Sequence, residues 1–261
     1  MKRNLLYTMA FLLLTLVGSG RSTAAPVTTL ADETLTYDVI YKWGFINKVA
    51  GYATMTLRNN GSTYEAALFA RNAPWASSIY SLRDTLYSTM SNPGLVPQSY
   101  IYIAHENKKY KKDIITFDHS GGSEVTATAQ RFKRSAPGEP LTENTVNFEG
   151  KAPAVDMLSS FFYLRTLDFD NMKNGETSVA TIFSGSKPEK LTITYQGRTT
   201  VEVNGVNLPA YKIVFTFTRK GSETSAPISG WISTDGQRIP LQVEGQLPVG
   251  KVRAVYTGPN P

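Results

Sequence analysis

Cysteine is absent from this sequence of 261 residues. Its absence excludes disulfide bonds, thiolate nucleophiles and zinc–thiolate sites together. Histidine is almost as scarce, because only His105 and His119 occur and neither belongs to a His-Glu-x-x-His pattern. The sequence also lacks a Gly-x-Ser-x-Gly elbow. We therefore expect no metal, no cofactor and no enzymatic activity, and we expect burial of an apolar core to hold the fold together.

Long apolar runs are also lacking, except for one that begins at Leu5 and ends at Val17. Lys2 and Arg3 precede this run, and the small residues Ser22-Thr23-Ala24 follow it, which is the pattern of a signal peptide. We expect residues 1–24 to be this signal peptide. With no cysteine for lipidation near the cut, we expect residues 25–261 to form a periplasmic protein without a transmembrane segment.

An excess of charge of either sign is missing too. Removal of residues 1–24 takes away three of the 27 basic residues and leaves 24 against 21 acidic ones, a net charge of +3. So small a balance argues against a nucleic-acid partner.

Period-two alternation of apolar and polar residues dominates what is present. Tyr211, Ile213, Phe215 and Phe217 lie on the phase opposite Lys212, Thr216 and Thr218, and 34–43 and 191–196 repeat the pattern. Such alternation is typical of antiparallel strands with one buried face. We expect a mainly β fold with minor α: one domain over 25–261, built as a large curved antiparallel sheet or half-barrel that wraps one or two short helices. Further strands are predicted near 47–58, 63–72, 84–91, 96–105, 111–118, 124–132, 177–183, 199–203, 228–234, 238–245 and 251–256.

Two segments interrupt the alternation and predict helices. The first spans 74–82, and the second spans 153–167, with Pro153 in its first turn and Asp156 where the helix dipole favours an acid. The second segment is apolar on nearly all sides, so we expect it to lie buried against the curved sheet. Residues 135–152, with Ser135, two prolines and two glycines, predict a connection between the two halves of the chain; we favour a long loop within one sheet over an interdomain linker.

Two short motifs link the chain to a bacterial group. Asp156-x-x-Ser159-x-x-x-Tyr163-x-Arg165 is followed later by Trp231-Ile232-Ser233-Thr234-Asp235 and Pro240. In these motifs and their order, residues 33–256 resemble the exported family called domain of unknown function 3108. The resemblance implies a fold and a compartment but no reaction. At the motif positions we expect Arg165 to pair with Asp156 or Asp235, Trp231 to fill the core and Asp235 to turn the chain.

Candidate ligand contacts come from the large aromatic side chains expected to face inward. They predict shelter for an apolar or lipid-like group, although such residues more often fill a core. These residues are Trp43, Trp75, Tyr80, Phe161, Phe162 and Phe215.

The densest run of charge, from Lys108 to Lys112, predicts contact with an anion or a partner through Lys108, Lys109, Lys111 and Lys112. The alternative is a charged edge that keeps sheets from pairing.

Three functions remain open at this point. The first is non-enzymatic binding of a lipid or lipoprotein ligand in a half-open barrel. The second is an envelope assembly or structural role with a protein partner. The third and least favoured is hydrolysis of envelope sugars or peptides, for which no carboxylate pair can be nominated from the sequence.

Overall fold

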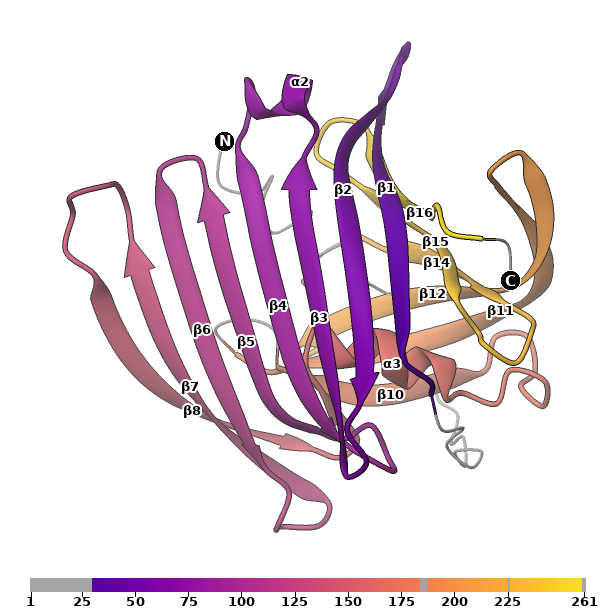
Figure 1. Cartoon of the computed structure of the whole chain (residues 1–261). Coiled ribbons are helices and arrows are strands. Elements are labelled where there is room, and N and C mark those ends of the chain that lie inside the picture. Colours follow the sequence, from indigo (N-terminus) through magenta and orange to yellow (C-terminus); the bar gives the residue numbers. More distant parts are fainter. Residues whose placement is uncertain (1–29, 184–186, 225, 260–261) are drawn as a thin grey trace.

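The computed structural model describes residues 30–183, 187–224 and 226–259. The expected signal peptide, residues 1–24, lies outside the described residues. Within them the chain is mostly β with two short helices, and its strands form one nearly closed, barrel-like sheet (Figure 1). The expected fold class is confirmed.

The first half of the chain is an up-and-down meander in which each strand pairs antiparallel with the next. The apolar phase of each strand faces the interior, as the alternating burial shows, and the register of neighbouring strands keeps these phases aligned. The strands are β1 (Glu33–Trp43), β2 (Ile46–Asn59), β3 (Thr63–Asn72), β4 (Leu82–Ser91), β5 (Pro97–Glu106), β6 (Lys109–Asp118), β7 (Glu124–Arg134) and β8 (Thr142–Lys151).

The second half continues the same sheet from the other side of β1. The order of strands along the sheet is β8-β7-β6-β5-β4-β3-β2-β1-β16-β15-β14-β12-β11-β10-β9, with β13 beside β12. The strands are β9 (Ala154–Val155), β10 (Thr177–Ile182), β11 (Glu189–Val203), β12 (Val206–Arg219), β13 (Ser222–Glu223), β14 (Ile228–Ser233), β15 (Pro240–Gln246) and β16 (Lys251–Tyr256).

Two contacts bring the sheet close to a ring. β1 pairs antiparallel with β16, where Tyr37 lies opposite Tyr256. On the far side β9 pairs parallel with β10, and the Thr181 hydroxyl accepts a hydrogen bond from Lys151 N (3.1 Å) and donates one to Lys151 O (2.7 Å). The end of β8 is thereby held against β10, whereas the beginning of β8 forms the end of the strand path.

Because the meander alternates direction, its connections gather at two ends. We call one end the rim; it holds the connections 44–45, 73–81, 107–108 and 135–141, together with 247–250 between β15 and β16. We call the other end the base; it holds 60–62, 92–96 and 119–123. In Figure 1 the rim is at the top and the base at the bottom.

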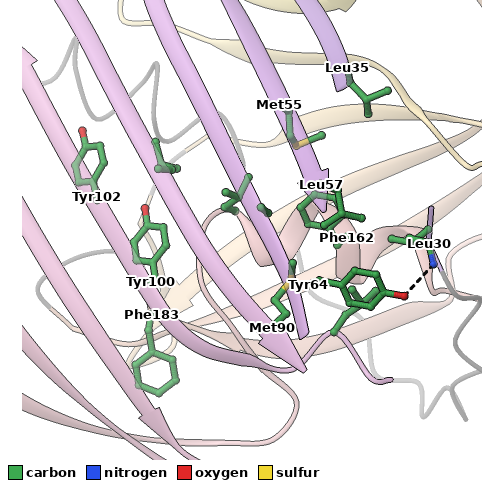
Figure 2. Close-up of a cluster of buried hydrophobic side chains, with 14 of the residues drawn as sticks. Leu30, Leu35, Met55, Leu57, Tyr64, Met90, Tyr100, Tyr102, Phe162 and Phe183 are labelled. Atoms are coloured by element: carbon green, nitrogen blue, oxygen red, sulfur yellow. Dashed lines mark hydrogen bonds between the residues drawn. The ribbon is translucent and has the colours of Figure 1, made fainter. Parts of the chain in front are cut away.

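The two helices are shorter than the sequence predicts. α2 (Pro74–Ser77) replaces the expected helix over 74–82, and α3 (Ser159–Arg165) replaces the one over 153–167. The second prediction was wrong at its start, because residues 154–155 join the sheet as β9 and the helical turns begin only after Asp156. The expectation that this segment is buried holds for Phe162, which is fully enclosed among residues of the meander (Figure 2).

Two further predictions need correction. Residues 142–151 are strand β8 and not part of a long loop; their weak signal reflects an end strand whose inward apolar side chains are few, mainly Val146 and Phe148. Residues 191–196 and 199–203 belong to one strand, β11, which is interrupted by a shift of register between Tyr195 and Arg198.

Candidate functional site

A row of three alanines, an aspartate and a lysine crosses the inner face of the sheet near the rim. The register places Ala53, Ala70, Asp84, Ala104 and Lys111 side by side on β2 to β6, all on the inward phase of their strands. We call these five residues the inner row. Adjacent strands are about 4.8 Å apart, so Asp84 and Lys111 lie roughly 10 Å apart at their backbones with only an alanine between them. An acidic and a basic side chain thus flank Ala104, whose methyl group fills little of the interior.

A charged network lies directly beneath the inner row. Arg131 donates two hydrogen bonds to Asp113, from Nε to Oδ1 (3.2 Å) and from Nη2 to Oδ2 (3.1 Å). Lys111 Nζ lies 2.7 Å from Oδ2 of the same carboxylate and 4.7 Å from the centre of the Tyr102 ring. Tyr102 in turn donates its hydroxyl hydrogen to Asp84 Oδ2 (3.0 Å). One connected path therefore links Arg131 to Asp84 across four strands.

Asp84 is the exceptional member of this network. Its side chain is buried, with the residue 4% exposed, and its Oδ1 atom has no hydrogen-bond partner among the described residues. Burial, reinforced by the negative charge of Glu106, raises the pKa of Asp84 to about 7. This enclosed oxygen can accept one further hydrogen bond.

Two neighbouring groups share this environment. Burial lowers the pKa of Lys111, and the Asp113 carboxylate opposes that shift. The Tyr100 hydroxyl, on the same inward phase of β5 as Tyr102, is buried without a partner among the residues that the structure describes. Figure 2 shows the hydroxyls of both tyrosines directed away from Phe183, which packs nearer the base.

The base half of the interior is instead closed by α3 and its leading turn. The Asp156 carboxylate caps the helix, since Oδ1 accepts hydrogen bonds from the backbone N–H groups of Leu158 and Ser159 (both 2.8 Å). Ser88 on β4 donates to the other oxygen (2.7 Å), which ties the helix to the meander. Burial raises the pKa of Asp156 to about 6, and these hydrogen bonds oppose the rise.

Arg165 does not pair with Asp156 or Asp235 as expected. Its guanidinium forms a bidentate pair with Glu33 at the start of β1 and donates to Gln237 O (2.8 Å). Glu33 sits beside the helix end because β1 enters the sheet at the base, which a local sequence pattern cannot show. Asp235 turns the chain as expected, accepting from Gln237 N (2.7 Å), whereas Trp231 is only partly buried.

The predicted aromatic contacts do not form one site. Trp43 is 54% exposed at the tip of the β1–β2 hairpin. Trp75 lies on α2 and donates its indole N–H to Val49 O (2.6 Å). Tyr80 follows α2, and burial together with the charges of Glu106 and Asp84 raises its pKa, so it alone of the three borders the charged network.

The remaining aromatics of that prediction lie deeper. Phe162 and Phe215 are fully buried in two separate clusters of the core, and Phe161 packs between the two clusters. These three residues fill space, which was the alternative interpretation of the aromatic set.

The predicted lysine cluster divides between the two faces of the sheet. Lys108 in the β5–β6 connection and Lys109 at the start of β6 are exposed at the rim. The alternation of β6 then turns Lys111 inward to Asp113 and Lys112 outward. Only the first two and Lys112 can therefore meet an external anion or partner.

Sequence reasoning missed the charged network itself. Asp84 occupies the apolar phase of its strand between Leu82 and Leu86, and Asp113 and Arg131 occupy the apolar phases of β6 and β7. A charge on the buried phase of a strand is the signal that would have found it, because such a charge needs a partner.

Other site types find little support. Among the described residues no group of three His, Asp or Glu side chains could hold a metal ion. Within the same residues, none of the helices has the length and apolar character needed to cross a bilayer.

Fold and site together define a nearly closed, barrel-like antiparallel β protein with a charged network inside its wall. The chain belongs to the family described as "Protein of unknown function (DUF3108)", whose family model matches residues 36–257. The expected resemblance is thus confirmed. None of the curated proteins matches the chain.

A similar fold occurs among solved structures. The beta-barrel-like protein of domain of unknown function DUF1849 from Brucella abortus is 10% identical, with a TM-score of 0.54 over 89% of this chain and 98% of its own. At this identity the likeness shows the shared fold alone.

Proposed function

We propose that this protein is an exported, periplasmic, non-enzymatic binding protein that takes an amphipathic, lipid-like ligand into the rim half of its barrel. The observation that carries the proposal is the gradient along the inward face of β4 to β7. Toward the base this face is apolar, with Met90, Ile115 and Phe117, and toward the rim it carries Asp84 and Lys111.

Such a gradient suits a ligand with an apolar body and a polar head. The free Oδ1 atom of Asp84 accepts a hydrogen bond from the head, and Lys111 supplies a positive charge on the other side of Ala104. Inward apolar side chains that stay partly exposed, Leu68 and Val146, lie along the path of the apolar body. Export is supported by the expected signal peptide.

The proposal is tested by extracting lipids from the natively purified protein and analysing them by mass spectrometry. We expect one lipid class in near-stoichiometric amount. An Ala104→Leu variant places a larger side chain between Asp84 and Lys111. The amount of that lipid recovered with this variant should be at least tenfold lower. Ala67→Leu, on the outward phase of β3, is the matched control and should retain it. Recovery of no lipid from the unmodified protein would falsify the proposal.

A second candidate is an assembly role with a protein partner. It is favoured by an exposed aromatic pair on the outer wall, where the rings of Phe69 and Tyr87 meet edge to face with centres 6.0 Å apart. Photo-crosslinking from position 69 in cells separates the two candidates. A single protein adduct supports assembly, and an absence of specific adducts counts against it.

A further inference from the structure

Most of the large apolar side chains that are exposed at the connections between strands lie at the rim. The β1–β2 hairpin turns through Gly44 (φ +55°) and presents Trp43, Phe45 and Ile46 to solvent, with Phe45 fully exposed. Val249 of the β15–β16 turn is 50% exposed beside this hairpin, and Tyr41 OH donates to its carbonyl oxygen (3.2 Å). Large apolar side chains exposed together mark a contact surface more often than single ones do.

Positive charge surrounds the same end of the barrel. Lys42 and Lys48 flank the hairpin tip. Lys108 in the β5–β6 connection and Lys109 at the start of β6 lie farther along the rim, beyond β3 and β4. No acidic residue lies in the hairpin segment 42–48, which the structure describes throughout.

A second row, with three arginines, a histidine and a tyrosine, lies on the outer wall just below the tips. The register aligns Arg71, Arg83, His105, Tyr110 and Arg134 in one lateral row on β3 to β7. Arg134 stacks over the Tyr110 ring (5.7 Å to its centre), so the row presents aromatic and cationic groups together. We call these five residues the outer basic row.

Few acidic groups lie at the rim. Glu139 and Glu143 are the exposed ones near the β7–β8 connection, Glu106 is partly buried, and Glu244 pairs with Lys251 (2.9 Å). The base differs from the rim, since the strand ends there carry the exposed acids Asp118 and Glu124, and among the described residues it has no exposed aromatic tip. The two ends of the barrel therefore differ in both charge and apolarity.

We propose that the rim docks on an anionic lipid bilayer, with the tip Trp43–Phe45–Ile46 inserted at the headgroup level and the outer basic row facing the lipid phosphates. Aromatic side chains favour the membrane interface, and cations near the surface bind anionic lipid. The order of groups, apolar at the extreme tip and cationic one step back, matches the order of acyl and phosphate layers. Docking goes beyond the proposed interior binding, because it uses only the outside of the barrel.

The test is cosedimentation of the purified protein with vesicles of phosphatidylglycerol and phosphatidylethanolamine. We expect binding that weakens with added salt and is at least tenfold weaker to vesicles of phosphatidylcholine alone. A Phe45→Ser/Ile46→Ser variant should bind anionic vesicles at least tenfold more weakly. In Lys108→Ala/Lys109→Ala, vesicle binding should weaken roughly fivefold for each lysine removed. Val96→Ser removes an exposed apolar tip at the base and is the matched control, expected to bind like the unmodified protein.

All variants have the same N-terminal residues 1–29, so any difference in vesicle binding between them comes from the substituted positions. The proposal is overturned if the unmodified protein ignores anionic vesicles, if neutral vesicles bind equally, or if the tip variant binds like the control. A photo-crosslinker at position 45 that labels a protein in place of lipid would also overturn it. Lipid extraction from the interior is independent of each of these results.

Discussion

At the residue scale, Asp84 shows how an interior carboxylate makes stability depend on pH. The folded protein holds the Asp84 proton up to about pH 7, whereas the unfolded chain releases it near its ordinary pKa of 3.8. The folded state therefore binds more protons between these values, and the free energy of unfolding falls as the pH rises from 4 to 7. The full effect is at most about 4 kcal/mol.

Asp84→Asn removes this titration and should flatten the fall in stability between pH 4 and pH 7. Urea unfolding followed at several pH values measures it. Asp156, whose pKa of about 6 acts in the same direction, leaves a residual slope. Asp118→Asn, at the exposed end of β6 near the base, serves as the control and should keep the unmodified slope over pH 5 to 8. Identical slopes for Asp84→Asn and the unmodified protein would contradict the assignment.

At the element scale, the seam between β8 and β10 is fitted around a glycine. A Cβ atom at Gly150 would lie 2.6 Å from Thr181 Cγ2 and 3.0 Å from Phe183 Cζ. Thr181 cannot rotate away at no cost, because its hydroxyl is bonded to both backbone groups of Lys151. The seam therefore tolerates no side chain at this position without movement.

Gly150→Ala should lower the free energy of unfolding by about 1–3 kcal/mol through overpacking. Thr181→Ser keeps the hydroxyl and removes the offending methyl group, so adding it to Gly150→Ala should recover part of the loss. A double-mutant cycle by chemical denaturation measures this coupling. Additive effects of the two substitutions would show that the seam is not packed as described.

The elements also show what the sequence can and cannot reveal. Strands with a strong apolar phase, such as 63–72 and 84–91, were predicted within two residues of their observed bounds. β8 was missed because its outward side chains are polar and few of its inward side chains are apolar. The helix start was misplaced because residues 154–155 pair with β10, a contact decided by tertiary structure.

The candidate site was the least predictable part. Its members lie on four different strands, and only the register brings Asp84, Tyr102 and Arg131 together. Alternation places each of them on the inner phase, but a sequence alone does not state which strands are neighbours. The aromatic residues chosen instead were selected for size, and size is equally typical of a core.

At the scale of the whole molecule, the two closures of the sheet are unequal. The β1–β16 ladder contains six register pairs, whereas β9 and β10 share two. The beginning of β8, nearer the rim, ends the strand path and is held on one side only, by β7.

Hydrogen exchange should therefore separate the two regions. We expect amides of 142–147 in β8 to exchange by local opening, well before those of 37–42 in β1, which should exchange only on global unfolding. Residues 101–106 of β5 also approach the rim but have neighbours on both sides, so they provide the control and should resemble β1. Equal protection throughout would mean that the sheet opens as one unit.

The β1–β16 ladder joins segments that lie far apart in the sequence. Thr257 N donates to Thr36 O (2.8 Å), and the hydroxyls of the same two residues meet although they are 221 positions apart. A strand synthesised early thus receives its second neighbour only when nearly all of the chain has been made. Until then its free edge can recruit foreign strands. We expect such a non-local pairing to form slowly and to leave the edge of β1 open to foreign strands until β16 has paired with it.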